Sequence, residues 1–340
     1  MEHHEDGVSI VIPLYNAEAH IEQVLKAVLE QDFGGALEII VVNDGSTDRS
    51  SQVITPFEAA GKIHVINQEN QGAAAATNRG FLAARYRIIC SIDSDVVLDR
   101  NWLRTVLEEF KDPDVGAVQG YYRTPDTVSF WARMMGYDVE KRYDDIPDKY
   151  VTQVCTGDTA YRKNALDRVG LFDTAFRYGY DNDMSYRLLQ AGYRLVFRKD
   201  AQCDHYWKAD IKSYIRQQYR SAYGRMQLVS KHQDKITGDS VSGLRMILQV
   251  PITLVAMLLL AAAAFSSLFP GHSTMVIAML GTALVLLAVL LADRTAFTIP
   301  IIRKHKDATA VFLPFVHLLR NAVWTWALLG WLAKKSGIRS

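Results

Sequence analysis

The C-terminal third of the chain contains a long stretch without any charged side chain. No Asp, Glu, Lys or Arg occurs from Met246 to Ala292. Because a membrane-spanning helix needs about 20 apolar residues, this stretch fits two spans joined by a turn. We therefore expect spans at Met246–Leu268 and Thr274–Ala292, with the turn at Phe269–Ser273. A buried helical hairpin of a soluble protein is the alternative, but soluble helices rarely stay uncharged over such a length.

The charged residues are divided unevenly between the two ends of the chain. From Lys208 to Arg339 there are 16 Lys and Arg against 5 Asp and Glu, whereas the whole chain has 38 and 37. The part before Lys208 is therefore acidic, and the basic part behind it is expected to meet something anionic. Basic flanks on both sides of the uncharged stretch, Lys231–Arg245 and Arg294–Lys306, place both of its ends in the cytoplasm by the positive-inside rule.

The N-terminal sequence MEHHEDG is acidic and lacks the basic region of a signal peptide. We therefore expect a multi-pass protein of the cell (inner) membrane, whose N-terminal domain faces the cytoplasm and carries no cleaved leader. The turn of the hairpin would then face outward.

A third apolar stretch, Val311–Leu332, contains His317, Arg320 and Asn321 and is followed by a basic tail. If this stretch crossed the membrane, the tail would lie outside, against the positive-inside rule. We expect an in-plane or re-entrant helix with its three tryptophans at the depth of the lipid head groups. A true third span is the alternative.

Together these features divide the chain into four segments. We expect a cytoplasmic catalytic domain in residues 1–204, a basic juxtamembrane segment in 205–244, two transmembrane helices in 245–293, and a basic loop with a third membrane-associated or spanning helix in 294–340.

Apolar runs typical of buried strands alternate with helical patterns in the first segment. We expect strands at Val8–Pro13, Leu37–Val42, Lys62–Ile66, Arg87–Ile92 and Val115–Gln119, and helices at Glu18–Glu30, Gly72–Ala84 and Trp102–Phe110. This alternation predicts an α/β domain with a Rossmann-like, mostly parallel sheet. Ligands bind such sheets beyond the carboxyl ends of the strands. Neither a dinucleotide fingerprint nor a P-loop follows any of these strands.

Carboxylates stand at the strand ends where those folds place glycines. Asp93 and Asp95 follow the fourth strand in the sequence Asp-Ser-Asp, and a hard divalent cation, Mn²⁺ or Mg²⁺, would relieve their mutual repulsion and hold a diphosphate. The alternative is a solvated acidic turn. Asp44 follows the second strand, where it could accept from a nucleobase or a ribose hydroxyl or could cap a helix. Asp181 opens a helix at Met184–Ala191 and could cap it or act as general base toward an acceptor hydroxyl.

Gly157-Asp158-Thr159 ends a strand-like run, Tyr150–Cys155. This position would let Asp158 line a bound substrate, either its donor or its acceptor part. The three cysteines, Cys90, Cys155 and Cys203, lie in no metal-binding spacing and are expected to be free thiols of a reducing cytoplasm.

Five ordered motifs resemble those of the inverting family 2 glycosyltransferases of the GT-A fold. They are VSIVIPLYN, VVNDGSTD, SIDSD, TGDTAYRK and FDTAFRYGYDNDMSYRLLQAGYRL, and they cover roughly residues 7–225. The ordered set is specific, whereas each motif alone is weak. The resemblance implies a nucleotide-diphosphate sugar (UDP- or GDP-sugar) as donor and a divalent metal as cofactor.

The resemblance also implies roles for single residues. Pro13, Tyr15, Asp44 and Asp93 would bind the nucleotide; Asp93 and Asp95 would form the D-x-D motif, with Asp95 the nearer metal ligand; and Asp181 would be the base. His205 matches a third metal ligand of some relatives, and a surface histidine beside Tyr206 and Trp207 is the alternative. Gln218 and Arg220 match a Q-Q-x-R-W motif whose residues touch the diphosphate or the acceptor. Two departures are Tyr180, where the family has Glu, and Ser221, where it has Trp.

Basic residues recur at intervals of three to five among apolar ones from Lys208 to Arg225. This pattern predicts an amphipathic helix on a membrane that carries anionic lipid. A nucleic-acid patch is rejected because the predicted spans hold this segment at the bilayer. The alternative is a plain tether that makes no substrate contact.

We therefore expect an inverting, metal-dependent glycosyltransferase that moves a sugar to a hydroxyl of a lipid-linked or membrane-proximal glycan acceptor. One alternative is a polyprenyl-phosphate sugar synthase of the dolichol-phosphate mannose type, whose anionic acceptor needs no base. A processive synthase is another, although two or three spans make a poor channel. The last is a non-catalytic scaffold that binds sugar nucleotides. The sequence leaves the sugar, the nucleotide, the acceptor and the oligomeric state open.

Overall fold

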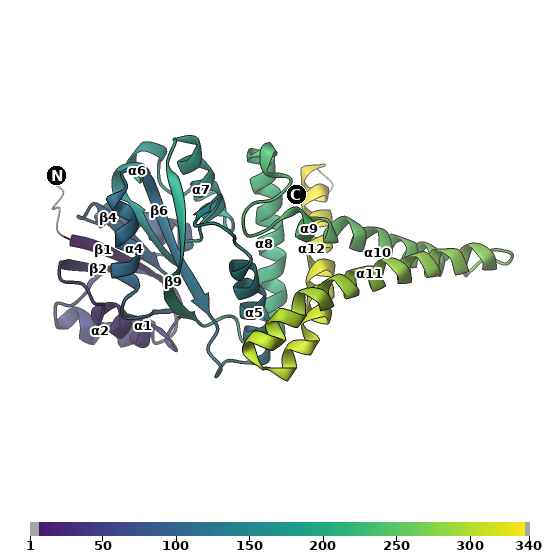
Figure 1. Cartoon of the computed structure of the whole chain (residues 1–340), viewed down its shortest axis with the longest axis horizontal. Helices are drawn as coiled ribbons and strands as arrows, with labels where there is room; N and C mark the ends of the chain where they lie inside the picture. Colours follow the sequence, from purple (N-terminus) through teal and green to yellow (C-terminus); the bar gives the residue numbers. More distant parts are fainter. Residues whose placement is uncertain (1–6, 337–340) are drawn as a thin grey trace. The chain divides into compact units, whose positions relative to one another are not determined.

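The computed structural model describes residues 7–336, so the predictions made on the acidic N-terminus and on Arg339 lie outside the described residues. The chain forms two compact units, which meet at the peptide bond between Trp207 and Lys208. We call them unit 1 and unit 2 and describe each by itself (Figure 1).

Unit 1 contains a nine-stranded mixed sheet. Its parallel half has the order β3-β2-β1-β4, and consists of β1 (Gly7–Leu14), β2 (Ala36–Asp44), β3 (His64–Gln68) and β4 (Ile88–Ile92). These are the first four predicted strands, each shifted by no more than two residues. β1 and the second half of β2 are buried almost throughout, as expected for apolar strands covered on both faces.

The other half of the sheet departs from the simple alternation of strands and helices. β8 (Asp158–Arg162) lies antiparallel between β4 and β6 (Val115–Arg123), and β9 (Arg194–His205) runs parallel to β6. Two short strands, β5 (Val96–Leu98) and β7 (Tyr150–Val151), pair antiparallel with β9. The prediction of a mostly parallel sheet is confirmed, and the sequence pattern did not indicate these antiparallel strands.

The helices of unit 1 connect these strands. They are α1 (Ile21–Leu29), α2 (Ser50–Ala59), α3 (Ala73–Ala83), α4 (Trp102–Leu107), α5 (Phe130–Asp144), α6 (Lys163–Val169) and α7 (Tyr180–Gln190). α1 begins at Ile21 rather than at the predicted Glu18. α4 ends at Leu107 and continues as a 3₁₀ turn to Lys111. α3 approaches β1 so closely at Gly80 that an added Cβ would lie 2.2 Å from Val11 Cγ1.

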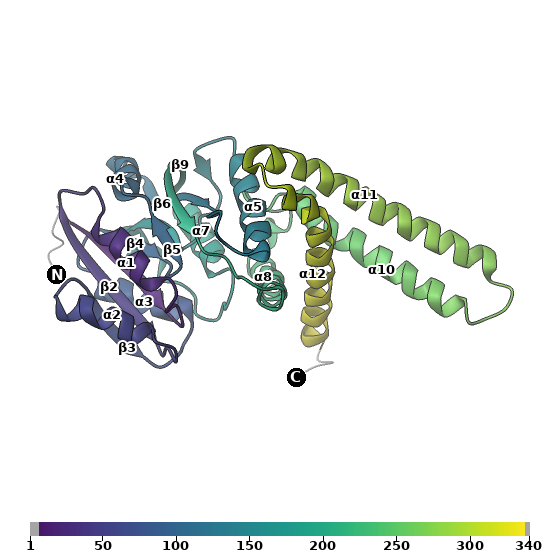
Figure 2. The same cartoon turned by 90° about the horizontal axis from the view of Figure 1, so that it is seen from below.

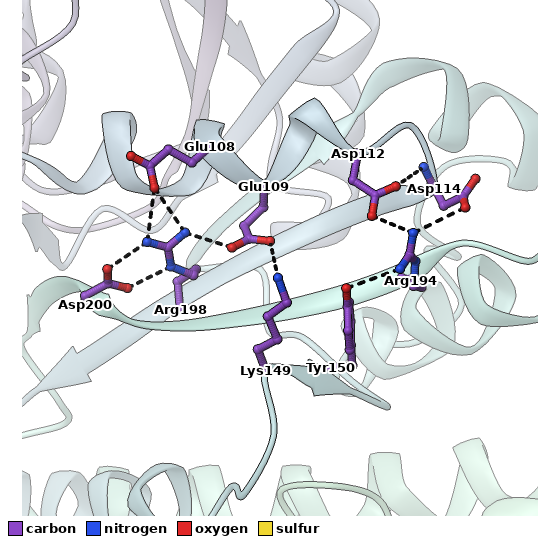
Figure 3. A network of polar contacts seen from close by, with 9 residues as sticks. All are labelled: Glu108, Glu109, Asp112, Asp114, Lys149, Tyr150, Arg194, Arg198 and Asp200. Atoms are coloured by element: carbon purple, nitrogen blue, oxygen red, sulfur yellow. Dashed lines mark hydrogen bonds and ion pairs between the residues drawn. The ribbon is translucent and has the colours of Figure 1, made fainter.

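Ion pairs brace the outer face of β9, where Figure 3 shows acidic side chains around two arginines and a lysine. Arg198 on β9 contacts Glu109 at 2.8 Å and Asp200 at 2.7 Å. Lys149, just before β7, reaches the same Glu109 at 3.1 Å. The network therefore ties the chain before β7 to β9 and to the turn after α4.

Unit 2 consists of helices. They are α8 (Ile211–Lys231), α9 (Leu244–Ile247), α10 (Gln249–Ser266), α11 (Ser273–His305) and α12 (Leu313–Lys335), with 3₁₀ turns at Gln233–Lys235 and Ala308–Phe312. Within the described residues, three segments are long and apolar enough to cross a membrane: Leu244–Ser266, Ser273–His305 and Ala308–Lys335. The turn between α10 and α11 falls at the predicted place, whereas α11 extends well beyond the predicted Ala292.

α10 and α11 form an antiparallel hairpin, and α12 crosses it rather than continuing beside it (Figures 1 and 2). Half of the most apolar window of α12 is buried inside the protein, compared with 22% for the segment of α10 and 11% for α11. α12 packs along α8, where the Trp324 indole N–H donates to Gln218 Oε1 at 3.0 Å. Both the in-plane arrangement and a third span stay predictions, since Ala308–Lys335 is long and apolar enough to cross a membrane.

Candidate functional site

Asp93, Asp95 and His205 form a cluster beyond the carboxyl end of β4. Each offers one ligand atom, and these three atoms lie within 4.8 Å of one another. Asp93 and Asp95 are half-buried and His205 is buried. Two carboxylate oxygens and an imidazole nitrogen form a donor set that suits Mn²⁺ well, whereas Mg²⁺ prefers oxygen donors alone. We call these three residues the metal cluster; they are the same three that the sequence analysis named as candidate metal ligands, and metal binding by them stays a prediction.

Backbone hydrogen bonds fix both aspartates of the metal cluster. The Asp93 N–H donates to the Gly157 carbonyl at 3.0 Å, and the Tyr206 N–H donates to the Asp95 carbonyl at 3.0 Å. The register of β5 on β9 pairs Val96 with His205, which brings the histidine beside Asp95. The position of His205 therefore depends on sheet pairing between segments that are more than 100 residues apart.

The ring of His205 is held by aromatic neighbours. It stacks on Trp207 with centroids 3.6 Å apart and an interplanar angle of 7°, and it meets the Tyr122 ring edge-on at 4.8 Å. Its Nε2 lies 4.0 Å from Asp95 Oδ1. Such packing fixes the orientation of a metal-binding imidazole before any ion arrives.

Gly157 leaves room for the Asp93 carboxylate. A Cβ at this position would lie 2.6 Å from Asp93 Oδ2 and 2.4 Å from the Tyr122 hydroxyl. Real Cβ atoms essentially never come so close, so any side chain here would displace both of these groups. The absence of a side chain at Gly157 is thus part of the site.

Asp181 lies in the first turn of α7, where the positive end of the helix dipole favours a carboxylate. Its Oδ1 accepts the Asn182 N–H at 2.9 Å. The Ser185 hydroxyl donates to the Asp181 carbonyl at 2.8 Å and accepts the Val154 N–H at 3.0 Å. These bonds fasten the start of α7 to the segment that leads into β8.

The phenol of Tyr180 lies within the range of the charges of both Asp93 and Asp181. Burial raises the pKa of this phenol, and the negative charges of Asp93 and Asp181 raise it further. Both carboxylates therefore lie within electrostatic reach of one hydroxyl. Asp181 itself is not among the three residues of the metal cluster, and its role as base stays a prediction.

Asp183, two residues after Asp181, has a different place. It is completely buried, and its Oδ2 accepts from Arg187 Nε at 2.8 Å. Arg187 in turn donates to the carbonyls of Val169, Gly170 and Leu171. Asp183 therefore anchors the preceding loop.

Asp44 lies at the end of β2 and is buried, with 2% of its surface exposed. Its Oδ1 accepts from Gln68 Nε2 and the Gln71 N–H, both at 2.8 Å, and its Oδ2 accepts the Gly72 N–H at 2.9 Å. The carboxylate therefore holds the loop that leads into α3, and it caps neither α3 nor α2. Because a carboxylate has about four acceptor positions, these three bonds leave about one for a nucleobase N–H.

Tyr15 and Pro13, the other predicted nucleotide contacts, lie at the end of β1. Half of the Tyr15 surface is exposed, whereas Pro13 is half-buried. Asn16 follows in a left-handed conformation, with φ 50°, and its Oδ1 accepts the Thr47 N–H at 2.8 Å. This bond joins the loops after β1 and β2, so Tyr15 and Asp44 belong to one connected edge of the sheet.

Asp158, a predicted contact of the donor sugar or acceptor, is completely buried in β8. Its two carboxylate oxygens accept from the thiols of Cys155 and Cys203, each at 3.5 Å. Burial raises the pKa of this carboxyl well above its usual range. Contact with a substrate would require these partners to move, so a role for Asp158 stays a prediction. All three cysteines are free, as the sequence predicted.

Gln218 and Arg220 belong to unit 2. Gln218 is buried against Trp324 of α12. Arg220, two residues further along α8, is exposed. The buried face of α8 carries Tyr214, Gln218, Ala222 and Leu228 at helical spacing. This confirms an amphipathic helix, and the contacts of both residues with a diphosphate or an acceptor stay predictions.

Sequence reasoning missed Tyr122, Trp207 and Gly157 as parts of the site. Tyr122 lies near the carboxyl end of β6, beyond Gln119, where the predicted strand ends, and no motif points to it. Trp207 was noted as a neighbour of His205 without a role. Gly157 was quoted only as part of a motif, since a close approach between distant segments leaves no local signal.

Residues 9–170 match the family model described as "Glycosyl transferase family 2". The chain is 30% identical over 206 residues to a poly-beta-1,6-N-acetyl-D-glucosamine synthase of Staphylococcus aureus, which covers 58% of this chain and 49% of that protein. It is 27% identical over 232 residues to the synthase of the same name from Staphylococcus epidermidis, covering 66% and 56%. The chain thus spans about half the length of the curated relatives it matches.

Among solved structures, the chain resembles the mannosyltransferase PcManGT of Pyrobaculum calidifontis, which was solved with GDP-Man and Mn²⁺. The TM-score is 0.60 at 21% identity, and the match covers 98% of this chain and 88% of that one. This likeness shows the fold. The motifs, the family match and the strand-end site agree: residues 9–170 carry a family 2 glycosyltransferase domain, and the chain has the GT-A fold.

Proposed function

We propose that this protein is a membrane-anchored inverting glycosyltransferase that moves one sugar from a UDP- or GDP-sugar to a hydroxyl of a lipid-linked acceptor at the cytoplasmic face. The observation that carries this proposal is the metal cluster, whose ligand atoms lie within 4.8 Å of one another, together with Asp181 within electrostatic reach of the same phenol as Asp93. Metal and base are the two groups that an inverting transfer between neutral hydroxyl and anionic leaving group requires.

Asp93, Asp95 and His205 would hold Mn²⁺. The donor set fits this ion, and a solved structure with a similar fold was obtained with Mn²⁺ and GDP-Man. A bound divalent cation would neutralise the charge that develops on the departing nucleotide diphosphate. The protein contributes the rigid placement of the ligands through the Gly157 and Tyr206 backbone contacts and the Trp207 stack.

Asp181 would act as the general base. Its oxygen takes the proton of the acceptor hydroxyl while the hydroxyl oxygen forms a bond to the anomeric carbon of the donor sugar. The bond from that carbon to the diphosphate oxygen breaks, and the nucleotide diphosphate leaves with the electron pair. The Asn182 N–H holds one oxygen of the carboxylate, which orients the other for this transfer.

Asp44 and Tyr15 would bind the nucleotide. Asp44 keeps about one acceptor position for a nucleobase N–H, and the exposed Tyr15 ring offers a stacking surface at the same edge of the sheet. Both uracil and guanine present an N–H of this kind, so these contacts are compatible with either class of donor.

The apolar helices of unit 2 support a membrane-borne acceptor. Many apolar side chains of α10 and α11 are exposed, among them Leu258, Ile277 and Leu284. A soluble monomer rarely exposes such a surface, whereas a bilayer would cover it. The basic residues at the open end of the hairpin support a cytoplasmic catalytic domain.

The test is nucleotide release by the detergent-purified protein from a panel of UDP- and GDP-sugars with Mn²⁺, with and without a membrane lipid extract. We expect release from one donor, stimulated by the extract. Asp181→Asn should lower transfer by about three orders of magnitude while donor binding stays intact, because the amide cannot accept the proton. Glu58→Gln, which changes an exposed carboxylate on α2, serves as the matched control.

Two results would contradict parts of this proposal. Full transfer by Asp181→Asn would point to an acceptor that is already an anion, such as a polyprenyl phosphate, which needs no base. Absence of both nucleotide binding and release across the panel would exclude the enzymatic function.

A further inference from the structure

A second cluster of polar side chains lies in unit 2, at the open end of the α10–α11 hairpin. It consists of Arg245, Gln249, Asp293, Arg294, His317, Arg320 and Asn321, and we call it the hairpin-base cluster. These residues come from α9, α10, α11 and α12, which are brought together here. None of them belongs to the metal cluster or to the function proposed above.

The contacts within this cluster fall into two sets. In the first, Asp293 pairs with Arg245 and with Arg294, so it joins α9 to α11. In the second, Arg320 Nη2 donates to Gln249 Oε1 at 3.1 Å, and the Arg320 guanidinium lies 4.9 Å from the centroid of the Trp324 ring. Gln249 Nε2 also donates to the Arg245 carbonyl at 3.3 Å, and this hydrogen bond connects the two sets of contacts.

Burial increases inward along the cluster. The Arg245 side chain is 71% exposed, that of Asp293 is 20% exposed, and that of Arg294 is 5% exposed. Arg320 is 2% exposed. The cluster therefore begins at the surface with one arginine and continues to two buried arginines.

Positive charge predominates in the cluster. Three guanidinium groups gather with one carboxylate, Asp293, and His317 lies near Arg294 through the Phe297 ring. Buried arginine in an apolar environment is costly and is a mark of function in membrane segments. The two contacts given above for Arg320, an amide oxygen and an aromatic face, are electrically neutral.

Asn321 gives an independent observation. Its side chain is completely buried, and neither its Oδ1 nor its Nδ2 has a hydrogen-bond partner among residues 7–336. Buried amides are almost always bonded, so such a group calls for a partner that the chain does not supply. A phosphate group offers several strong acceptor oxygens, which suit the amide N–H₂ and the neighbouring guanidinium alike.

The cluster also lies at the expected depth for a lipid head group. Gln249 begins α10, and Asp293 directly follows the uncharged stretch on α11, so both lie at the end of the hairpin opposite its turn. If the hairpin crosses the membrane, this end is where apolar chain gives way to charge. A head group there would meet the exposed Arg245 first.

We propose that the hairpin-base cluster binds the phosphate of a membrane lipid, with Arg320, Arg294 and Asn321 as its contacts and Arg245 at its entrance. The inference concerns unit 2 alone and does not depend on glycosyl transfer. Two lipids share this chemistry: an anionic phospholipid of the bilayer and a polyprenyl monophosphate. A purely structural cluster that locks α12 across the hairpin is the competing explanation, and the experiment separates it.

The full chain, purified in detergent and stripped of lipid, is mixed with micelles of phosphatidylcholine alone, with added phosphatidylglycerol, or with added polyprenyl monophosphate. Native mass spectrometry counts the lipid that each protein retains. We expect one phosphate lipid per chain in at least one of the last two mixtures and none in the first. Retention of phosphatidylglycerol would mean that the site binds anionic phospholipids in general. Retention of the polyprenyl phosphate alone would mean that the site binds lipids of the proposed acceptor class. Equal retention from all three mixtures would overturn the proposal.

The decisive variant is Gln249→Glu, which keeps the size of the side chain and places a carboxylate against Arg320. A structural lock would keep or gain stability by this ion pair and lose no lipid. A phosphate site would retain its lipid about tenfold more weakly, the loss expected for one charge-assisted hydrogen bond. Arg245→Gln at the exposed entrance should lower retention in the same direction without endangering the fold. Lys334→Gln, an exposed charge at the far end of α12, is the control and should change nothing.

Thermal unfolding of each variant with and without lipid completes the test. The parent protein and Lys334→Gln should gain stability from the retained lipid, whereas Gln249→Glu and Arg245→Gln should gain less. Undiminished retention in both Gln249→Glu and Arg245→Gln would overturn the proposal.

Discussion

The metal cluster of unit 1 and the hairpin-base cluster of unit 2 gather charges of opposite sign. In the first, Asp93 and Asp95 converge on one side of His205. In the second, three arginines gather with one aspartate. Like charges held together raise the energy of the fold unless a ligand of opposite sign binds. The comparison teaches that clusters of opposite charge suit different ligands, which is why we propose a divalent cation for unit 1 and a phosphate for unit 2.

Removing one carboxylate of the metal cluster is expected to have the largest effect. Asp95→Asn should lower metal-dependent nucleotide release by about three orders of magnitude, because stabilisation of the leaving diphosphate is worth several kcal/mol. Chelation of the metal should reproduce this loss in the parent protein. Lipid retention by unit 2 should stay unchanged, which separates the two clusters.

Mn²⁺ binding to Asp95→Asn, measured by calorimetry or by electron paramagnetic resonance, shows whether the loss of nucleotide release goes with a loss of the metal. Full turnover by Asp95→Asn, or turnover in the parent that chelation leaves intact, would break the comparison by showing that the two aspartates need no cation.

Gly157→Ala should have the next largest effect. The new Cβ would lie 2.6 Å from Asp93 Oδ2 and 2.4 Å from the Tyr122 hydroxyl, so the Asp93 carboxylate must move together with the hydroxyl. Because small displacements at a metal site weaken both binding and catalysis, we expect the Mn²⁺ affinity to fall about tenfold to a hundredfold. Titration of Mn²⁺ into the variant measures this directly.

Gly34→Ala provides the matched control, since a Cβ at Gly34 meets no atom within 4 Å. An unchanged Mn²⁺ affinity in Gly157→Ala would mean that Asp93 is not a ligand in the place where the structure puts it.

The strand-end carboxylates could be predicted from the sequence because their signals are local. Asp44, Asp93 and Asp95 each follow an apolar strand directly, and the carboxyl ends of parallel strands share one edge of a sheet. Asp181 was found in the same way from the start of its helix. In these places sequence order and spatial order agree.

Other features depend on pairing between distant segments. The insertion of β8 between β4 and β6 buries Asp158, which the sequence placed at a strand end beside the substrate. The pairing of β5 with β9 delivers His205 to Asp95, and only the family resemblance pointed to it. α2 was missed because its sequence contains Pro56 and has a weak apolar pattern. The hairpin-base cluster arises because α12 crosses the hairpin, and the hydrophobic pattern of the sequence does not predict this crossing.

Glu38 differs from the aspartates of the metal cluster, because side chains of the protein itself stabilise its charge. Burial tends to raise the pKa of Glu38, but hydrogen bonds from Ser9 and Arg85 outweigh it and lower the pKa below its usual value of 4.5. A depressed pKa stabilises the fold above the unfolded value, and this stability is lost as the pH falls through the folded value. The stability should therefore decline below about pH 4.5.

Glu38→Gln should lower the free energy of unfolding by about 1.5 kcal/mol at neutral pH, the value of hydrogen bonds to a charged group. The difference from the parent should shrink as the pH falls below about 4.5. Thermal unfolding of the detergent-solubilised chain across this range provides the measurement, and Mn²⁺ should have no influence on it. A difference that stays constant down to pH 3 would contradict the assigned cause.

The network on β9 is expected to give the smallest effect (Figure 3). Arg194 contacts Asp112 and Asp114 there, and its side chain is 42% exposed. Water screens such pairs, so Arg194→Gln should cost less than about 1 kcal/mol, or about 2 °C in the melting temperature of unit 1. Charges of both signs alternate in this network, so it needs no ligand, unlike the two clusters compared above. A loss of Mn²⁺ binding or of lipid retention in Arg194→Gln would show instead that this face is coupled to a ligand site, and that mixed charge is no guide to a purely structural role.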